Sequence, residues 1–448
     1  MRSRYWIATP IFALAIAGSV EMGAGYSRPG QAATQVRTQA QPQTPPRPGS
    51  PAACLQASRD YWAAQMKVPR DQRGPSFLKD AAAGRLKVAR ECASPISVES
   101  TPVAELAQLA ELYVETQQPE LARAAIDRAL AAPVGSPAER AERLVTAVKV
   151  TMRQPKAPGA LDAAEAYVGE LDRLPSGFVA ARVAAHAQMN GYYRADDIDK
   201  GIVQHSEALI AIGRTMTPEQ RKAAGYSLVS AYVNLAEVLA GREDAGGAVD
   251  LLRRAPAELA GIDGAEETVR PVLERYLLAG TTAAAIEAPR WLNAPAGTTR
   301  MEMAGAVTVL EFTAHWCGPC RESYPALVRF EKRFGPRGFR VVLGTELYGY
   351  FESRQNLTPA EETEADRQYF AGHGFTGPIA ISDPAVIKKL PDGRVERMPN
   401  PNDAAYKVSG IPQIQIIDKR GRIRLIMIGY DEANEERLAG LVERLLAE

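Results

Sequence analysis

The five-residue segment 316–320, Trp-Cys-Gly-Pro-Cys, constrains this chain more than any other, because it places two thiols three positions apart. Residues 307–312 before it are apolar and rich in β-formers, which predicts a buried strand. From Arg321 onward, apolar residues recur at helical spacing. Cys317 is therefore expected at a helix N-terminus, where free backbone N–H groups lower the pKa of a thiol. Cys320 would lie one turn later, close enough to resolve a mixed disulfide formed on Cys317.

Two cysteines at this spacing also form half of a structural zinc site, which needs two further ligands. The other cysteines, Cys54 and Cys92, lie far apart in a different segment, and none of the four histidines pairs with another at ligand spacing. We therefore interpret the pair as a redox dithiol and expect no metal. The dithiol is its own redox centre, so no separate cofactor is expected.

Residues from about 288 to 448 resemble a thioredoxin-fold domain, closest to the periplasmic thiol–disulfide oxidoreductases of the TlpA and ResA type. Glu311, six residues before Cys317, falls where that family places a buried acid beneath the dithiol. Pro325 falls at the position that kinks the active-site helix, and Gly410-Ile411-Pro412 is similar to the cis-proline loop.

The C-terminal end of the chain extends this resemblance. Residues 414–428 resemble the family's terminal hairpin, and residues 435–446 resemble its last helix. The segment 345–359 is longer than the usual connection after the second strand. The matching motifs agree in type, spacing and order over roughly a third of the chain.

The resemblance implies disulfide exchange with protein partners, in which Cys317 attacks and Cys320 resolves. Glu311 stands in an apolar strand, where burial would raise its pKa and suit it to exchange protons with Cys320. The alternative is a buried acid paired with a lysine. Trp316, Ile411 and Pro412 would shape the substrate groove. The Gly-Pro between the cysteines resembles the reducing members, which favours reduction of partners over oxidation or isomerisation of new disulfides. The family resemblance implies re-reduction by a membrane electron donor.

The start of the chain is typical of a secretory signal. A short basic stretch, residues 1–4, precedes a sixteen-residue apolar run, residues 5–20, and then small residues. The run is short for a membrane span, so residues 1–32 are a signal peptide or an N-terminal anchor. Residues 33–51 form a Pro/Gln-rich tether. We expect export, either to the periplasm or to the outer face of the inner membrane, where disulfides persist.

Residues 52–285 are rich in alanine and leucine, and strand signals are scarce, which predicts an all-α region. Two windows share the offsets of tetratricopeptide repeats, in which small residues let paired helices approach closely. A true repeat solenoid and a plain helical array both remain open. Such a region would bind another protein, position the redox domain, or form a bundle without a ligand. The matching positions are Leu109, Ala110, Tyr113, Ala122, Ile126 and Ala129, then Leu235, Ala236, Leu239, Ala248, Leu252 and Ala255.

Cys54 and Cys92 stand near opposite ends of two predicted helices, 52–66 and 75–92. Three interpretations are open for them: a structural disulfide that ties a helical hairpin, a second redox pair, or two free buried thiols. The first is favoured, because nothing electropositive is evident near either residue to activate a thiol.

The sequence also predicts the surroundings of several side chains near the dithiol. His315 is expected to be exposed or to tune the Cys317 thiolate, and Arg321 to be a surface cation. The aromatic residues of the long connection would cover the groove or pack locally. Residues 361–366 are predicted to form the solvated face of a helix.

Charge and composition exclude other classes of function. Lys plus Arg equals Asp plus Glu at 53 each, so no basic stripe favours nucleic acid and no polybasic cluster favours anionic lipid. The sequence thus predicts a multi-domain chain: an all-α, helical-repeat N-terminal region and an α/β thioredoxin-like domain at 286–448. The predicted function is thiol–disulfide exchange. The alternative is a helical-repeat binding scaffold that carries the thioredoxin-like domain as an accessory module.

Overall fold

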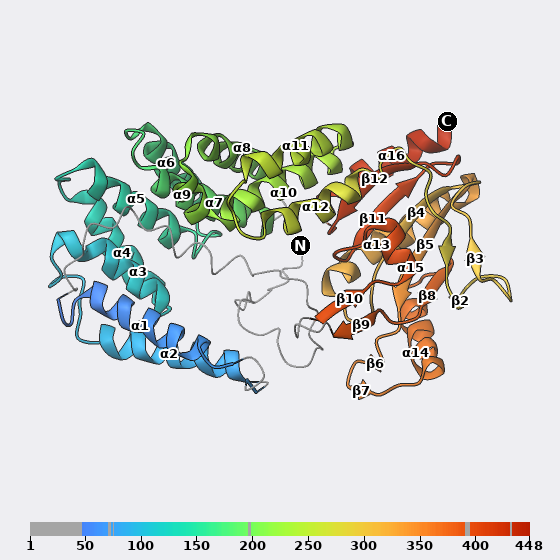
Figure 1. Cartoon of the computed structure of the whole chain (residues 1–448), viewed down its shortest axis with the longest axis horizontal. Coiled ribbons are helices and arrows are strands. Elements are labelled where there is room, and N and C mark those ends of the chain that lie inside the picture. Colours follow the sequence, from blue (N-terminus) through green and yellow to red (C-terminus); the bar gives the residue numbers. More distant parts are fainter. Residues whose placement is uncertain (1–46, 70–72, 75, 196–198, 390–394, 431) are drawn as a thin grey trace, which may run out of the picture. The chain divides into compact units, whose positions relative to one another are not determined.

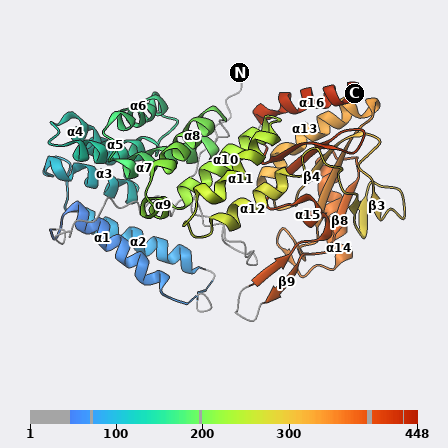
Figure 2. The same cartoon turned by 45° about the horizontal axis from the view of Figure 1, so that its top comes forward.

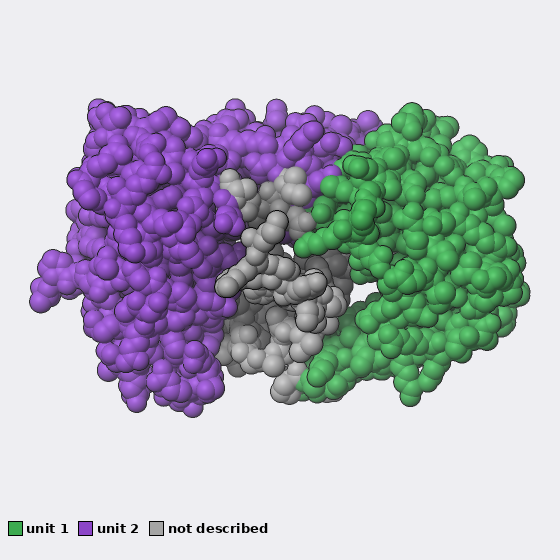
Figure 3. All heavy atoms as spheres, turned by 180° about the vertical axis from the view of Figure 1, so that it is seen from behind, with its two compact units in different colours: residues 1–22, 28–192 green, residues 23–27, 193–448 purple. Residues whose placement is uncertain are grey.

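The computed structural model describes residues 47–69, 73–74, 76–195, 199–389, 395–430 and 432–448. The predicted signal or anchor at 1–32 and most of the predicted tether lie outside these residues. The described chain forms two compact units, one ending at Tyr192 and the other continuing from Tyr193 to Glu448 (Figure 3). Within the described ranges, no helix is both long enough and apolar enough to cross a bilayer.

The predicted all-α region is confirmed: its described residues form twelve α-helices and one 3-10 turn at Val103–Glu105 (Figure 1). Several helices begin with proline behind a Ser or Thr cap, as at Ser136 and Thr217, because proline suits the first helical turn. The helices are α1 (Pro51–Met66), α2 (Phe77–Ala93), α3 (Leu106–Glu115), α4 (Pro119–Ala131), α5 (Pro137–Thr151), α6 (Ala160–Arg173), α7 (Val179–Ala195), α8 (Asp199–Thr215), α9 (Pro218–Ala224), α10 (Tyr226–Gly241), α11 (Ala245–Glu258) and α12 (Ala265–Tyr276).

The two windows of repeat-like sequence form the helix pairs α3–α4 and α10–α11, whose members pack against each other. Small residues such as Ala110 and Ala122 are fully buried, and so are large ones such as Leu109 and Leu252. Helices that meet through alanine approach closely, and the larger side chains fill the remaining space. The packing accounts for the pattern, and the assignment to tetratricopeptide repeats stays a prediction.

A disulfide joins α1 to α2, because Cys54 and Cys92 face each other across this helical hairpin with their Cα atoms 5.5 Å apart. The two cysteines are 38 positions apart in sequence. Closing a loop of this length removes conformational freedom from the unfolded chain. The first helical hairpin is therefore cross-linked at one place.

Replacing both Cys54 and Cys92 by Ala should lower the free energy of unfolding of the first unit by about 4 kcal/mol, from the chain-entropy cost of the lost loop closure. Urea unfolding of the full-length variant and of the wild type, followed by far-ultraviolet circular dichroism, measures the difference. Alkylation before any reductant, followed by mass spectrometry, checks the bond itself. Labelled thiols at both positions in the wild type would contradict the cross-link.

The second unit contains a six-stranded sheet in the order β12–β11–β4–β5–β8–β2. Strands β4, β5 and β8 run parallel, and the other neighbouring pairs are antiparallel. The strands are β1 (Ile286–Glu287), β2 (Arg290–Leu292), β3 (Arg300–Met301), β4 (Val307–Phe312), β5 (Phe339–Glu346), β6 (Tyr350–Phe351), β7 (Arg354–Gln355), β8 (Ile379–Ser382), β9 (Val386–Lys389), β10 (Val395–Met398), β11 (Gln413–Ile417) and β12 (Ile423–Ile428).

Helices cover both faces of this sheet. On one face, α13, α14 and α16 contribute side chains to a single apolar core. Figure 2 shows α13 and α16 next to each other. On the other face, Tyr406 of α15 packs on Phe312 of β4. The helices and 3-10 turns of this part are α13 (Gly318–Phe334), η4 (Gly335–Arg337), α14 (Pro359–Gly372), α15 (Pro401–Tyr406), η5 (Glu432–Asn434) and α16 (Glu435–Ala447).

The connectivity of this region defines its fold. Strand β4 leads through α13 to the parallel strand β5, and the chain later returns through β11 and β12 as an antiparallel hairpin beside β4, followed by α16. This is the thioredoxin-like arrangement. The predicted α/β thioredoxin-like C-terminal domain is therefore confirmed.

Helices α8–α12 belong to the same compact unit as the sheet. The chain after α12 adds to the free edge of β12: Gly280 N–H donates to the carbonyl of Ile423, and Ala283 N–H to that of Gly421, both at 2.8 Å. Helix α10 also packs against β12. This edge of the sheet is therefore covered by helical and extended segments from earlier in the chain.

Candidate functional site

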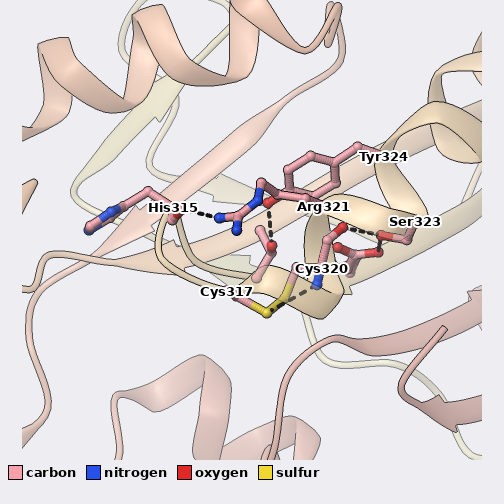
Figure 4. Close-up of a disulfide and its surroundings, with 8 residues drawn as sticks. His315, Cys317, Cys320, Arg321, Ser323 and Tyr324 are labelled. Atoms are coloured by element: carbon pink, nitrogen blue, oxygen red, sulfur yellow. Dashed lines mark hydrogen bonds between the residues drawn. A yellow bond between two sulfur atoms is a disulfide. The ribbon is translucent and has the colours of Figure 1, made fainter. Parts of the chain in front are cut away.

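The dithiol lies where β4 leads into α13, at the carboxyl end of the parallel strands (Figure 4). Cys317 is the N-cap of α13, and its Sγ accepts the backbone N–H of Cys320 at 3.2 Å. The two sulfurs are bonded to each other. Pro319 occupies the first turn, where its missing N–H costs nothing. A helix N-terminus that points an N–H at Cys317 favours its thiolate once the disulfide opens.

Glu311 lies at the centre of the sheet with none of its surface exposed. In the sheet, Glu311 is paired with Leu343 on β5 and with Ile414 on β11, so apolar strands flank it on both sides. Burial raises the pKa of this carboxyl to about 8, because the charged form loses its hydration. The Ser323 hydroxyl partly offsets this effect by donating to Oε2 at 2.7 Å. The other oxygen, Oε1, has no hydrogen-bond partner among the described residues.

Ser323 connects this acid to the dithiol. Its Oγ lies 2.7 Å from Glu311 Oε2 and also 2.7 Å from the backbone carbonyl of Cys320 (Figure 4). A hydroxyl carries one hydrogen, so it donates to one of these acceptors at a time. When Glu311 is ionised, Ser323 donates to it. When Glu311 is protonated, its own O–H donates to Ser323, whose hydrogen then turns to Cys320. Both protonation states of the acid keep a partner.

A second hydroxyl pair lies beside Glu311. Thr313, two residues further along β4, and Tyr324, next to Ser323 on α13, bring their oxygens within 2.6 Å of each other, and both side chains are buried. Each hydroxyl therefore has a hydrogen-bond partner. A buried hydroxyl without one would destabilise the fold. Ser323, Thr313 and Tyr324 belong to no motif that the sequence displays. Only their spacing from Cys320 and Glu311 could have drawn attention to them.

His315 is buried with 6% of its surface exposed, so the expectation of an exposed histidine was wrong. Its ring stacks on Phe351 at 4.6 Å between centroids and meets Tyr348 and Tyr350 edge-on. Desolvation lowers the pKa of this imidazole to about 4, which leaves it neutral at physiological pH. The reason for the error is tertiary: the long connection after β5 folds back over His315.

The same connection is anchored by α14. The carboxylate of Glu362 accepts the backbone N–H groups of Tyr348 and Gly349, each at 2.7 Å. Glu362 and Asp366 are each 1% exposed, so the prediction that residues 361–366 form a solvated helix face was wrong for these two. Burial raises the pKa of both carboxyls, that of Asp366 to about 7, because the charge of Glu362 adds to the desolvation. Part of this acidic helix face is buried because the Glu362 carboxylate holds the connection.

The three predicted groove residues differ in exposure. Trp316 is 38% exposed and meets Tyr348 edge-on at 5.4 Å. Ile411 is half-buried against the core that contains Cys317 and Cys320, and Pro412 is buried. The Ile411–Pro412 peptide bond is cis, as the sequence predicts. Because Gln413 pairs with Phe312, Pro412 lies beside the end of β4 from which the chain runs to the dithiol.

No group of three or more His, Cys, Asp or Glu side chains that could hold a metal ion occurs within the described ranges. Cys54 and Cys92 belong to the other unit and are bonded to each other.

Two known proteins are similar to part of this chain. Thioredoxin-like protein YneN of Bacillus subtilis (strain 168) is 27% identical over 126 residues, which cover 28% of this chain and 58% of that protein. Thioredoxin H-type of Oryza sativa subsp. indica is 44% identical over 49 residues, 11% of this chain and 40% of that protein. The chain thus spans about half the length of these relatives. No protein-family model matches it.

Solved structures also align with part of the chain. A thiol-disulfide isomerase from Corynebacterium glutamicum is 19% identical, covers 38% of this chain and 97% of its own, and has a TM-score of 0.29. The thioredoxin-like superfamily protein SPOA0173 is 21% identical over 37% of this chain and 97% of its own, also with a TM-score of 0.29.

The strand connectivity and the cysteine pair together define the class. The C-terminal part of this chain is a thioredoxin-like domain, similar in part of its sequence to a thioredoxin-like protein, and Cys317–Cys320 is its CxxC pair. An all-helical region precedes it.

The stability of the domain should depend on pH through Glu311. Its pKa rises from an ordinary 4.5 to about 8 on folding, so the folded chain holds a proton that the unfolded chain releases between these values. The stabilisation is complete below about pH 4.5 and is lost as the pH rises through about 8. Relative to Glu311→Gln, which cannot ionise, the wild type should lose up to about 1.4 kcal/mol per pH unit across this range.

Urea unfolding of both proteins at several pH values, with the Cys317–Cys320 bond oxidised throughout, measures this difference. A constant gap between wild type and Glu311→Gln from pH 5 to 8 would show that the carboxyl titrates normally.

Proposed function

We propose that this protein is an exported thiol–disulfide oxidoreductase that reduces disulfides in other proteins through Cys317 and Cys320. The observation that carries the proposal is the arrangement at the start of α13. Cys317 caps the helix, Cys320 is bonded to it, and one serine hydroxyl links the Cys320 carbonyl to a fully buried acid. A CxxC pair with only a structural role would not need a buried, protonatable group beside it.

The reaction runs in two exchanges. The Cys317 thiolate attacks one sulfur of a partner's disulfide; a new S–S bond forms, the partner's own S–S bond breaks, and its first thiolate leaves and takes a proton. The Cys320 thiol then gives up its proton, attacks the Cys317 sulfur and releases the second thiolate of the partner. Two electrons pass from the dithiol to the partner, and the chain ends with the Cys317–Cys320 disulfide.

Glu311 takes the proton that Cys320 must lose. A carboxyl with a pKa of about 8 is closely matched to a thiol, whose ordinary pKa is about 8.5, so proton transfer between them needs little driving force. Ser323 keeps the acid hydrogen-bonded before and after the transfer. An exposed glutamate would be ionised at neutral pH and too weak a base for this task.

Trp316, Ile411 and Pro412 form the groove that receives the partner. The exposed face of Trp316 offers apolar contact on one side of the dithiol. The loop that carries Ile411 and Pro412 packs against the core that contains Cys317 and Cys320, and an extended segment of the partner would pair with its backbone.

Export, direction and electron source rest on the sequence. The basic and apolar start of the chain supports passage to the periplasm or attachment to the outer face of the inner membrane. The Gly-Pro between the cysteines supports the reducing direction. A membrane electron donor would then return the disulfide to the dithiol. Reduction of insulin with a dithiol donor tests the activity against the alternative of a binding scaffold, which would leave insulin intact.

The two cysteines should respond differently to replacement by serine. Cys317→Ser should abolish exchange, because the attacking thiolate is gone. Cys320→Ser should instead accumulate mixed disulfides with partners, because the resolving step is gone. Non-reducing electrophoresis and mass spectrometry of each variant after incubation with oxidised substrate distinguish the two outcomes. Trapping by Cys317→Ser in place of Cys320→Ser would reverse the assigned roles.

Glu311→Gln should slow exchange by roughly 10²–10⁴-fold, the usual contribution of a positioned acid or base. The rate of the wild type should rise with pH through about 8, where Glu311 ionises, and this inflection should be missing in the variant. The rate of mixed-disulfide resolution measured from pH 6 to 9 provides the test. An unchanged profile in the variant would remove the acid from the mechanism.

A further inference from the structure

The loop that carries the groove residues Ile411 and Pro412 is held by a helix from the N-terminal part of the chain. Arg275 on α12 donates through Nη2 to the hydroxyl of Ser409, two residues before Ile411. The two residues are 134 positions apart, and both belong to the second compact unit. Arg275 is only 2% exposed, so its charge is buried where helix and loop meet. Figure 1 shows α12 beside the β12–β11 end of the sheet.

The hydrogen bonds around this guanidinium are few. Its Nε and Nη1 have no hydrogen-bond partner among the described residues. The hydrogen bond from Nη2 to the Ser409 hydroxyl is therefore an important polar contact of this guanidinium. The compensating charge is Glu237 on α10, whose Oε1 lies 3.9 Å from Arg275 Nη1. The other oxygen of Glu237 accepts from Arg194 on α7 at 2.9 Å. One carboxylate is therefore shared by two arginines.

Such a buried charge restricts geometry. Removing a guanidinium from water is costly, and the cost is offset only where the paired carboxylate and the hydroxyl acceptor stay in place. Helices α7, α10 and α12 fix the positions of Arg194, Glu237 and Arg275. The hydrogen bond from Arg275 then determines where the Ser409 hydroxyl lies. The loop is also tied at its far end, because Gly429 N–H donates to the Pro412 carbonyl at 2.8 Å.

We propose that Arg275 is a positioning residue for the redox reaction: through Ser409 it holds the Ile411–Pro412 loop in place to receive an extended segment of a partner protein. This inference rests on the proposed function. It assigns to α10 and α12 a part in substrate recognition by the dithiol domain. A small disulfide needs no groove, so its reaction with Cys317 does not depend on this contact.

The test compares how the full-length chain reduces two substrates, insulin and a small aromatic disulfide. Ser409→Ala removes the acceptor, and Arg275→Met removes the charge while keeping the bulk. Each should raise the KM for the protein substrate about tenfold through misplacement of the groove, with kcat and the small-disulfide rate unchanged. The double variant should show no further loss, because both changes break one contact. Ser409→Thr, which keeps the hydroxyl, should restore the wild-type KM.

Lys407→Ala is the matched control. It changes the same loop and breaks an ion pair to α12, between Lys407 Nζ and Glu274 Oε2 at 3.3 Å, but both side chains are well exposed and such pairs contribute little. Its KM should equal that of the wild type. An unchanged KM in Ser409→Ala and Arg275→Met, or an equal loss in Lys407→Ala, would overturn the inference. Failure of the wild type to reduce even the small disulfide would contradict the proposed function itself.

Discussion

The burial of one carboxyl group organises the redox domain. Glu311 lies in the middle of the sheet because β4 is flanked by β5 and β11, and no water reaches its side chain. A charged group there is unstable, so its pKa rises to about 8, into the range of a thiol. The position of β4 also sets the position of Cys317, since the strand leads directly into α13. The acid and the dithiol are therefore placed by the same strand.

The helical region contributes to this domain more directly than its separate sequence suggests. Helices α8–α12 share a compact unit with the sheet, and the chain after α12 covers the edge of β12. An uncovered edge strand invites pairing with other chains. Covering it also brings the buried charge of Arg275 to the loop before Pro412. Helices α1–α6 lie in the other unit, so the two ends of the helical region have different structural surroundings.

The long connection after β5 shows where sequence reasoning reached its limit. The sequence shows that it is long and predicts that its aromatic residues either cover the groove or pack locally. In the structure its aromatic residues pack locally: Phe351 stacks on His315, and Tyr348 meets Trp316 edge-on. The acidic residues of α14 were assigned to solvent because they are charged. Glu362 is buried because its carboxylate binds two backbone N–H groups of the connection, a pairing that offsets the cost of burial.

Local pattern determined much of this protein. The spacing of apolar residues, the proline and glycine at helix ends, and the Trp-Cys-Gly-Pro-Cys segment predicted the strand β4, the helix α13, the all-helical region and the cysteine pair. These features depend on neighbours a few positions away, so a sequence displays them. The bonds Ser323–Glu311 and Arg275–Ser409 join residues 12 and 134 positions apart. Only the tertiary structure decided them, because a buried polar group takes whichever partner the packing of distant elements brings within reach.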